Sequence, residues 1–492
     1  MASEAPLRVA SAPSYIWRTV NKYEVEILPD ACIDCGICAQ VCPYDVYEKK
    51  PGLVHISAPK SSNCIGPHNC EGQSFFCVDN CPTDAIRVGE NAYYEDLGDD
   101  RWPADLITST WYMAETGQLP PPGIEHRTGD SGGGFDRLHF VFPEDPTPVG
   151  EVDTSLDLNR RPWGPRIRTP IPIYGAAMSY GSVSLNVMLS RIRAAKAWGT
   201  YCSTGEGGYP EALIPYADHV ITQVATGLFG VSEASIQRAP IVEIKYAQGA
   251  KPGLGGHLLA DKNTPDVAKI REAVAKTSLF SPFPFHSVYS VEDHKKHVDW
   301  LRSVNPDALI SVKVSTPVDV DMVAVGSYYA GTNILNLDGG YGGTGAAPDI
   351  AKKNIAMPIE YAIPKVHRFL EAEGIRDEIV LMASGGIRTA YDVAKAIALG
   401  ADGCIIGTAE LVALNCTRCG NCERGRGCQH GIATTDPELV PLIPADLGAQ
   451  RIYNMYHAWR LQWVDLLTRL GLESFRDLRG RYDLLRYEGA IL

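Results

Sequence analysis

The hydrophobic positions after residue 170 fall into eight short apolar runs, separated by glycine-rich turns or by stretches with helical periodicity. A short apolar run bounded by turn residues is typical of a buried strand. The runs cover 171–177, 200–203, 219–224, 240–245, 308–314, 333–337, 379–383 and 403–406. Helices are predicted between most of them, for example over 183–197, 291–304, 358–373 and 390–399. Eight strands alternating with helices predict an α/β fold, a (β/α)8 TIM barrel, rather than a doubly wound sheet.

Upstream of this region, two cysteine runs have the spacing of iron–sulfur ligands. Cys32, Cys35, Cys38 and Cys42 read C-x2-C-x2-C-x3-C-P, a ferredoxin pattern in which the fourth cysteine ligates the other cluster. The second run, Cys64, Cys70, Cys77 and Cys81, is more widely spaced. Exchanging the fourth cysteines assigns one [4Fe–4S] cluster to Cys32, Cys35, Cys38 and Cys81, and another to Cys42, Cys64, Cys70 and Cys77. Zinc is the weaker alternative, because its sites usually pair two C-x2-C units.

A third cysteine set follows the last predicted strand. Cys416, Cys419, Cys422 and Cys428 are spaced C-x2-C-x2-C-x5-C, which favours a cubane iron–sulfur cluster over a zinc knot. The two remaining cysteines, Cys202 and Cys404, lie in apolar strand-like runs, and we interpret them as core residues.

The cysteines, the apolar runs and the proline- and glycine-rich stretches divide the chain into five segments. We expect an N-terminal extension, a ferredoxin-like domain with two clusters, a linker that wraps the barrel, the barrel with its own iron–sulfur site, and a C-terminal helical tail. Their respective ranges are 1–22, 23–92, 93–165, 166–440 and 441–492.

The loops after the carboxyl ends of the strands should carry the chemistry, as they do in barrels generally. After the last two strands, the backbone amides of Gly385, Gly386, Gly407 and Thr408 can approach a phosphate closely, because glycine has no side chain. Lys313 ends a strand facing the same space, where its charge can stabilise a reduced flavin. A structural salt bridge is its alternative role. The sequence GYGGTG (340–345) matches a dinucleotide-binding loop, but it follows the sixth strand, which favours a flavin-facing loop instead.

Two basic residues after the fourth strand predict a site for a small dianionic acid. Lys251 supplies a point charge and Arg271 a bidentate grip on a carboxylate. Arg271 lies in an amphipathic run, so a surface salt bridge is its alternative role. Glu206 lies among glycines on a predicted mouth loop and would face substrate or ammonium. His257 and His286 are weaker candidates, because each is equally compatible with a buried structural histidine.

Composition narrows the choice of partner and compartment. A net charge of −13 disfavours binding to nucleic acid or to an anionic membrane. No apolar run reaches the roughly 18 residues of a spanning helix, and the first residues lack the features of a signal peptide. The sequence therefore predicts a cytoplasmic protein, in which cysteines bind metals rather than form disulfides.

Nine ordered motifs between residues 166 and 440 resemble the FMN-binding synthase domain of glutamate synthase. They are PIYGAAMSYGS, STGEGG, QVATGLFGVS, EIKYAQGAKPGLGG, SPFPFHSVYSVEDH, NPDALISVKV, GGTGAAP, SGGIRT and the cysteine run ending HGIATTDPEL. With a ferredoxin module in front, the chain resembles the short archaeal-type form, whose other functions reside on separate subunits. The resemblance implies FMN-dependent reduction of 2-iminoglutarate, formed from 2-oxoglutarate and ammonia, to L-glutamate.

The resemblance also implies roles for individual residues. FMN contacts fall on Met178, Ser179, Gln223, Lys313, Gly342, Gly343, Gly385, Gly386, Gly407 and Thr408. The 2-oxoglutarate site falls on Gln248, Lys251 and Arg271. Glu206, near the incoming ammonia, Lys251 and Lys313 are the expected catalytic residues.

Three departures from the family pattern qualify these expectations. Leu254 and His257 replace a glutamate and a glutamine of the substrate loop. The family's [3Fe–4S] cluster uses three cysteines, which match Cys416, Cys422 and Cys428, whereas Cys419 offers a fourth ligand and favours [4Fe–4S]. A glutaminase domain, whose nucleophile is an N-terminal cysteine, is not recognisable, since the first cysteine is Cys32. An NAD(P)H site is not recognisable either. Ammonia is then free or comes from a separate glutaminase subunit, and a ferredoxin or NAD(P)H flavoprotein subunit supplies electrons in a hetero-oligomer.

Two alternatives stay open. An N-methylglutamate synthase subunit would use an alkylamine in place of ammonia. A non-catalytic electron-transfer subunit would use the clusters alone.

Overall fold

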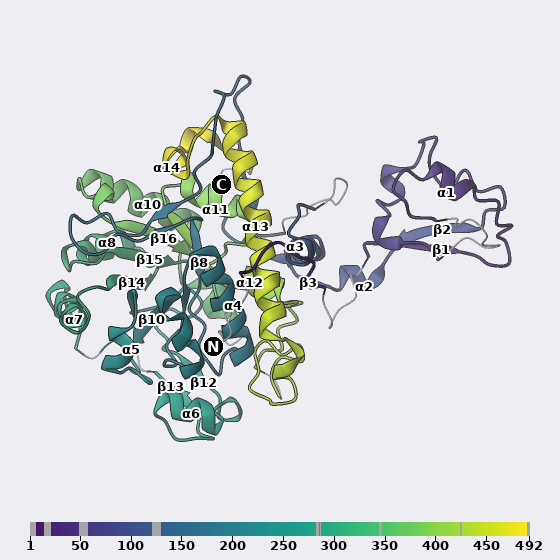
Figure 1. The fold of residues 1–492 in the computed structure, drawn as a ribbon. Coiled ribbons are helices and arrows are strands. Elements are labelled where there is room, and N and C mark those ends of the chain that lie inside the picture. Colours follow the sequence, from purple (N-terminus) through teal and green to yellow (C-terminus); the bar gives the residue numbers. More distant parts are fainter. Residues whose placement is uncertain are drawn as a thin grey trace.

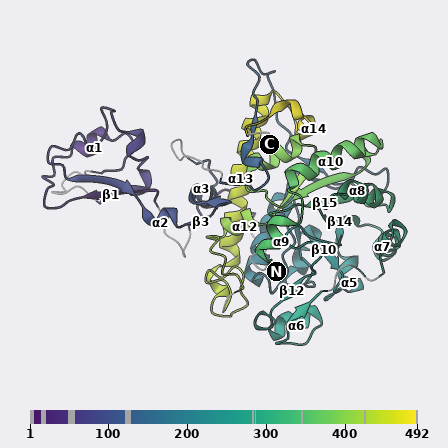
Figure 2. The same ribbon diagram turned by 180° about the vertical axis from the view of Figure 1, so that it is seen from behind.

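A computed structural model describes residues 6–13, 21–48, 58–120, 129–281, 285, 287–343, 347–423 and 426–489. Its main body is a closed barrel of eight parallel strands, and a small separate lobe lies to one side of it (Figures 1 and 2). The strands follow in spatial order as β8 (Ile173–Gly175), β9 (Cys202–Ser203), β10 (Val220–Ala225), β11 (Ile241–Lys245), β14 (Leu309–Ser315), β15 (Ile334–Asp338), β16 (Val380–Ser384) and β17 (Gly403–Ile406). The predicted (β/α)8 fold is confirmed, and every predicted strand overlaps an observed one.

The inward-facing side chains of the barrel change from apolar to charged along the strands. In register across β11 and β14, Ile241 pairs with Leu309, Glu243 with Ser311, and Lys245 with Lys313. Successive side chains of a strand alternate between faces, so these six side chains share one face. Ile241 and Leu309 belong to a buried apolar layer at the amino ends of the strands. The sequence thus builds an apolar floor below a charged mouth.

Helices cover the outside of the barrel. They include α4 (Leu185–Trp198), α5 (Glu233–Gln237), α7 (Val291–Val304), α8 (Val320–Tyr329), α9 (Asp349–Asn354), α10 (Ile359–Ala372), α11 (Ala390–Ala398) and α12 (Thr408–Ala413). The outward face of the strands, for example Val242, Ile310 and Leu335, joins them in the main core. An insertion after β11 carries β12 (His257–Leu258), η5 (Ala260–Lys262), α6 (Pro265–Arg271) and β13 (Leu279–Phe280).

The separate lobe corresponds to the cysteine-rich region. Strand β1 (Tyr23–Ile27) pairs antiparallel with β2 (Ile86–Glu90), with Val25 opposite Val88. Between these strands lie α1 (Ile37–Val41), η1 (Ser61–Asn63) and η2 (Pro67–Asn69). Val25, Val46, Tyr47 and Ile86 form its small core together with Cys38. So little apolar burial gives weak stability without additional cross-links, which clusters bound by cysteine would provide.

A narrow neck joins this lobe to the barrel. It consists of α2 (Ala92–Glu95), the short hairpin β3 (Gly98–Asp99) and β4 (Trp102–Pro103), and then α3 (Ala104–Thr116), which lies on the barrel body (Figure 1). Further along the predicted linker are η3 (Phe135–Arg137), β5 (Leu138–Phe140), β6 (Leu156–Asp157) and β7 (Arg168–Thr169). Strand β5 pairs with β18 (Leu485–Tyr487) near the carboxyl terminus.

The carboxyl-terminal region is helical, as predicted. Helix α13 (Ala445–Leu470) packs against α4 and α3, and α14 (Phe475–Leu478) follows it. Asn454 of α13 donates to the Ala10 carbonyl at 2.7 Å, and Arg451 donates to the Ala12 carbonyl at 2.6 Å. Residues 6–13 are therefore fixed to the barrel body, and the chain leaves this body to form the lobe before returning to it.

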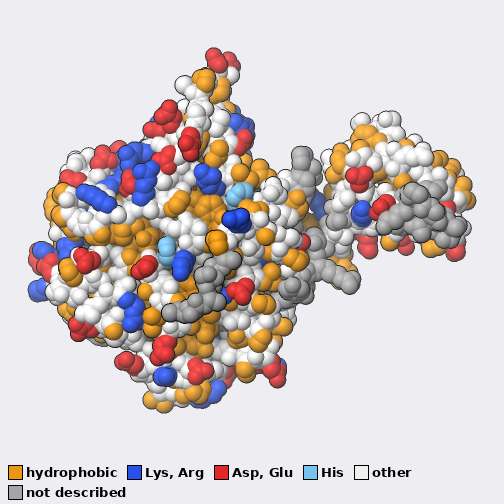
Figure 3. All heavy atoms as spheres, in the orientation of Figure 1, with side chains coloured by type: hydrophobic (Ala, Val, Ile, Leu, Met, Phe, Trp, Pro, Cys, Tyr) orange, Lys and Arg blue, Asp and Glu red, His pale blue; other side chains and the backbone are white. Residues whose placement is uncertain are grey.

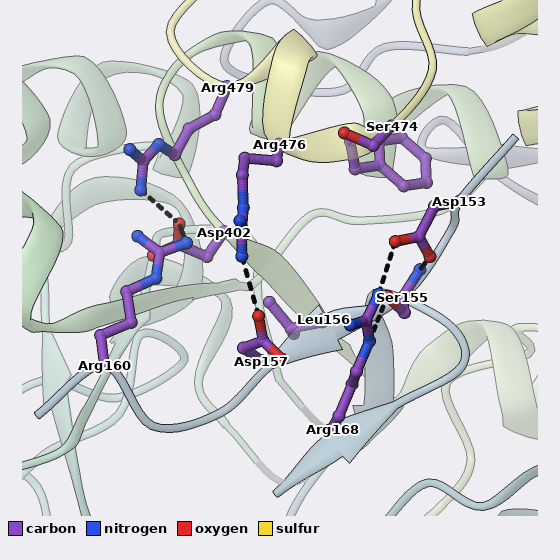
Figure 4. Close-up of a pocket in the computed structure, with 11 residues that line it drawn as sticks. Asp153, Ser155, Leu156, Asp157, Arg160, Arg168, Asp402, Ser474, Arg476 and Arg479 are labelled. Carbon is purple, nitrogen blue, oxygen red and sulfur yellow. Dashed lines mark hydrogen bonds and ion pairs between the residues drawn. The ribbon is translucent and has the colours of Figure 1, made fainter. Parts of the chain in front are cut away.

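A cavity of about 120 Å³ (Figure 4) is lined by Asp402, which directly precedes β17, so the cavity lies at the amino ends of the strands, opposite the mouth. Asp402, directly before β17, has its two carboxylate oxygens 2.6–3.1 Å from the guanidinium groups of Arg160, Arg376 and Arg479. Burial alone would raise the pKa of Asp402, but these three cations hold it well below its ordinary value. The cluster ties the linker and the carboxyl-terminal segment to the bottom of the barrel.

On the face shown in Figure 3, acidic and basic side chains are interspersed over the barrel body. Among the described residues, no helix combines the length and the apolar character needed to cross a bilayer.

Candidate active site and cluster-binding sites

Glu243 is the centre of a buried hydrogen-bond network inside the barrel. Its carboxylate accepts from Gln223 Nε2 at 2.7 Å, from Ser311 Oγ at 3.1 Å and from Asn336 Nδ2 at 3.0 Å. The four side chains come from the neighbouring strands β10, β11, β14 and β15, and all are buried. The network fixes Gln223, one of the predicted flavin contacts, in a single orientation below the mouth.

An ion pair lies one layer higher, at the carboxyl ends of β14 and β15. Lys313 Nζ is 3.2 Å from Asp338 Oδ2. Asp338 also accepts from Ser384 Oγ at 2.7 Å and from the Gly249 amide at 2.9 Å. Burial alone would lower the pKa of Lys313, but Asp338 and Glu243 outweigh it and raise the pKa. Lys313 is therefore a retained cation, and the structural salt bridge considered as its alternative role is present.

A second charged group surrounds Glu206 on the loop after β9. Its carboxylate lies 3.1 Å from Lys245 Nζ. Burial alone would raise the pKa of Glu206, but the cations of Lys245, Lys251 and Arg271 outweigh it and lower the pKa. Three cations thus converge on one carboxylate and leave an excess of positive charge at the mouth. This excess suits an incoming ligand with two negative charges.

Arg271 is buried rather than exposed. It is 5% exposed, and its Nη2 donates to Ser179 Oγ at 3.0 Å and to the Tyr180 carbonyl at 2.9 Å. The alternative role of a surface salt bridge is therefore wrong, because α6 turns Arg271 inward toward the loop after β8. Among the described residues, its Nε has no hydrogen-bond partner, so a donor of the guanidinium is left for a ligand.

Lys251 lies beside His257, with 3.1 Å between Nζ and Nδ1. Burial and the Lys245 cation lower the pKa of Lys251. Of the other loop residues, Gln248 is half-buried and Leu254 is exposed, while His286 lies outside the described residues.

The glycine loops of the mouth pack backbone against backbone. A Cβ added to Gly342 would lie 2.8 Å from the Gly385 Cα, and one added to Gly385 would lie 2.5 Å from the Gly339 carbonyl. Gly385 and Gly386 have φ values of 88° and 83°, which favour glycine. The Met178 side chain lies close to Gly407: a Cβ added to Gly407 would be 3.9 Å from Met178 Cε.

The other predicted flavin contacts are placed near these loops or on their borders. Thr408 begins α12, and Gly343 lies against Ala250. Residues 344 and 345 of the GYGGTG loop lie outside the described residues. A phosphate-bearing cofactor fits the donor set, because backbone amides without side chains line a mouth that carries Lys313.

In the lobe, two cavities are lined by the cysteines in the exchanged sets that the spacing predicts. One is lined by Cys32, Cys35, Cys38 and Cys81, and the other by Cys42, Cys64, Cys70 and Cys77. Among the described residues, no three His, Cys, Asp or Glu side chains are placed to hold a single metal ion. The sulfurs instead surround a space between them, which suits a multi-iron cluster.

The third cysteine set lies next to the barrel mouth. Burial raises the pKa of the Cys416 thiol, and Cys422 and Cys428 are near enough to raise it further. Cys419 is exposed at the rim. Lys262 of η5 donates to the Cys422 carbonyl at 2.6 Å and to Glu423 at 2.9 Å. This links the cysteine loop to the insertion that carries Arg271. Cys202 and Cys404 are buried in the barrel, which confirms them as core residues.

Three residues of the mouth were not predicted as site residues: Glu243, Lys245 and Asp338. Each lies at an inward-facing position near the carboxyl end of its strand. The signal was present in the sequence, because a charged residue inside an otherwise apolar run at that end of a barrel strand indicates the site.

A barrel with a charged mouth, joined to cavities lined by cysteines with ferredoxin spacing, is the architecture of an iron–sulfur oxidoreductase. Residues 138–473 match the family described as the conserved region in glutamate synthase, and residues 25–48 match a 4Fe-4S binding domain. The chain belongs to the glutamate synthase family, and the resemblance drawn from the motifs is confirmed.

Curated relatives match along nearly the whole chain. The archaeal glutamate synthase [NADPH] of Methanocaldococcus jannaschii is 37% identical, with 97% of this chain and 96% of the relative covered. The archaeal-type glutamate synthase [NADPH] of Dehalococcoides mccartyi is 36% identical, with 95% and 96% covered. The glutamate synthase [NADH] of Schizosaccharomyces pombe is 33% identical over 72% of this chain, which corresponds to 17% of that longer protein.

Proposed function

We propose that the chain carries out FMN-dependent reductive amination of 2-oxoglutarate to L-glutamate through 2-iminoglutarate. The observation that carries this proposal is the convergence of Lys245, Lys251 and Arg271 on Glu206 at the barrel mouth. Three cations and one carboxylate leave a net charge that complements the two carboxylates of 2-oxoglutarate. Relatives that are named glutamate synthases support the same assignment.

Arg271 and Lys251 bind and orient the keto acid in this proposal. The planar guanidinium grips one carboxylate, and the lysine attracts the other as a point charge. Condensation with ammonia releases water and gives the imine. Reduction of the imine then takes two electrons and two protons to give glutamate. Glu206, whose pKa is lowered, stays ionised and attracts ammonium.

FMN fits the glycine loops, Met178, Ser179 and Gln223, and when bound it supplies the hydride equivalent. Lys313 is raised in pKa by Asp338 and Glu243, so it holds a positive charge where a reduced flavin bears a negative one. Lys251 is lowered in pKa, so it releases a proton to the product nitrogen more readily than an exposed lysine. Electrons reach the flavin through the cysteine-bound clusters.

The further cofactor and partner assignments belong to the same proposal. The lobe holds two [4Fe–4S] clusters, and the third cysteine set holds one more, with [3Fe–4S] as the alternative. Ammonia is free or delivered by a separate glutaminase subunit. A ferredoxin or an NAD(P)H flavoprotein subunit supplies the electrons, and the names of the relatives include NADPH.

The proposal is tested with purified holoprotein. We expect about one FMN and about twelve irons per chain; about eleven irons would indicate a three-iron third cluster. Reduced ferredoxin or an artificial donor should drive conversion of 2-oxoglutarate and 15N-ammonium into labelled L-glutamate. Methylamine is added in competition to separate N-methylglutamate formation from this reaction. Holoprotein that forms neither L-glutamate from ammonium nor N-methylglutamate from methylamine contradicts the proposal. The alternative of a non-catalytic electron-transfer subunit is then left.

A further inference from the structure

The β3–β4 hairpin of the neck reaches the flavin side of the barrel. Figures 1 and 2 both place β3 between the lobe and the barrel. Arg101, between the two strands of the hairpin, donates to the Tyr341 carbonyl, and its guanidinium lies over the Tyr341 ring at 4.8 Å. Its own carbonyl accepts from Arg388 Nη1 at 2.9 Å. Arg101 thus contacts the loop after β15, predicted to face the flavin, and the loop after β16, which carries Gly385 and Gly386 of the predicted phosphate site.

The same hairpin also contacts the third cysteine loop. Asp99 Oδ2 accepts from Arg418 at 2.9–3.0 Å, and Arg418 lies between Cys416 and Cys419. Asp99 and Arg101 therefore connect two functional loops that are far apart in the sequence. A hairpin that served only as a spacer would not need a half-buried cation at this position.

Arg101 lies near the cations of Arg388 and Arg418, which have carboxylate partners in Asp392 and Asp99. Burial, together with the cations of Arg388 and Arg418, lowers the pKa of Arg101 to about 10. Glu360 neutralises the charge of Arg101 only in part, because burial raises the pKa of its carboxyl group to about 7. Among the described residues, Arg101 Nε is buried without a hydrogen-bond partner. Such an arrangement is unfavourable by itself and becomes favourable when an anion is present.

A backbone surface faces the same guanidinium. A Cβ added to Gly386 would meet only Arg101 Nη2, at 3.5 Å, and no other atom within 4 Å. The space in front of Gly386 is therefore bordered by a glycine backbone on one side and by Arg101 on the other. Glycine amides together with an arginine are the donors that bind a phosphate monoester.

We infer that Arg101, although it lies outside the barrel, binds the phosphate of the flavin. This inference rests on the proposed function and extends it, because it makes the neck a part of the cofactor site. Binding of the phosphate neutralises the cations and fixes the β3–β4 hairpin. The hairpin in turn holds Arg418 and the third cysteine loop through Asp99. Cofactor binding thereby orders the connection through which electrons enter the barrel.

The experiment compares FMN with riboflavin, which lacks the phosphate. Binding to flavin-free protein is measured by flavin fluorescence for the wild type, Arg101→Met, Arg101→Lys and the control Arg168→Met, whose arginine lines the cavity at the opposite end of the barrel. We expect Arg101→Met to weaken FMN binding about 10- to 100-fold and riboflavin binding by less than about 2-fold. The FMN affinity of Arg101→Lys should lie between those of the wild type and Arg101→Met, because lysine keeps the positive charge but lacks the planar guanidinium.

A second measurement needs no substitution. Hydrogen exchange in the Gly98–Pro103 hairpin of the wild type should slow with FMN and should not slow with riboflavin. The inference is overturned if Arg101→Met leaves the FMN affinity unchanged or lowers the affinities for FMN and riboflavin equally. It is also overturned if both flavins slow hydrogen exchange in the hairpin equally. A wild-type protein that binds neither flavin instead overturns the proposed function itself.

Discussion

Lys313 Nζ and Asp338 Oδ2 lie 3.2 Å apart at the carboxyl ends of adjacent barrel strands. Both residues are buried, at 7% exposure each. Burial alone would raise the pKa of Asp338, but Lys313 and the Ser384 hydroxyl hold it below its ordinary value. Each charge is thus maintained by the other, and the mouth keeps a cation that solvent does not screen.

Replacement of Lys313 by methionine should destabilise the barrel, because it leaves the Asp338 carboxylate buried and unpaired. We expect a loss of about 3–5 kcal/mol in the free energy of unfolding. The double variant Lys313→Met/Asp338→Asn should lose less than Lys313→Met alone, since no uncompensated charge is left. Chemical denaturation of the three proteins measures this coupling. Additive losses would show that the two side chains act independently.

The same cation should matter for catalysis. Lys313→Gln should lower kcat about 10²- to 10³-fold, the usual cost of losing one preorganised charge at a reacting centre. Flavin content and the KM for 2-oxoglutarate should change little. Steady-state kinetics on flavin-loaded enzyme separate these quantities. A variant that loses flavin in proportion to activity would assign Lys313 to binding instead.

Arg271 should control affinity for the keto acid. Arg271→Lys keeps the charge but loses the planar fork, so we expect the KM for 2-oxoglutarate to rise about 10-fold or more. Arg238→Lys, at the carboxyl-terminal cap of α5, is the control and should leave KM unchanged. Kinetics over a range of 2-oxoglutarate concentrations provide the test. A fall in kcat at constant KM would contradict a role in substrate binding.

The exchanged cysteine sets predict which cluster each substitution removes. Cys42→Ser should remove the cluster of Cys64, Cys70 and Cys77 and spare the other one. Iron should fall from about twelve to about eight atoms per chain. Cys404→Ser, a change in the barrel core, should keep all of the iron. Iron analysis and electron paramagnetic resonance distinguish the outcomes. If Cys42→Ser and Cys35→Ser abolish the same electron paramagnetic resonance signal, both cysteines ligate one cluster and the sets are not exchanged.

Asp402 should make the barrel sensitive to acid. Its pKa is depressed in the folded state, so its contribution to stability is present above the unfolded pKa of about 4 and is lost as the pH falls below it. Asp402→Asn should lose about 3–5 kcal/mol at neutral pH, because three arginines lose their partner. The stability of this variant should then decline less steeply than that of the wild type between about pH 5 and pH 2.

The control for this prediction is Asp299→Asn, which removes an exposed pair with Lys295 on α7. Such pairs contribute roughly 0.5 kcal/mol or less. Urea unfolding at several pH values measures both variants. Parallel stability curves for Asp402→Asn and the wild type would contradict the depressed pKa.

The barrel could be predicted from the sequence because its strands are buried on both faces, so that each appears as a continuous apolar run between glycine-rich turns. A helical carboxyl-terminal segment was also predicted, and the 26-residue α13 forms most of it. The exchange between the two cysteine runs was predicted from the ferredoxin pattern. The charged residues Glu243, Lys245 and Asp338 were missed although they interrupt these apolar runs at alternate positions. Their position marked them as site residues, but their partners depend on the register between strands, which one strand alone does not show.

Arg101 could not be predicted at all. It lies about 240 residues before Tyr341 in the chain, and its neighbours in sequence have the character of a loop. Only the folded neck brings it to the barrel. Likewise, the inward turn of Arg271 depends on α6, because the amphipathic pattern of that helix is compatible with an exposed arginine.

The exchanged cysteines also have a consequence for biosynthesis. A nascent chain that has emerged as far as Cys64 carries three sulfurs of one cavity and two of the other. The missing ligands, Cys70, Cys77 and Cys81, come from the last part of the lobe. Under the proposed assignment of a cluster to each cavity, neither cluster would be fully ligated before this part has left the ribosome. Iron–sulfur assembly would then act on a lobe that is already synthesised.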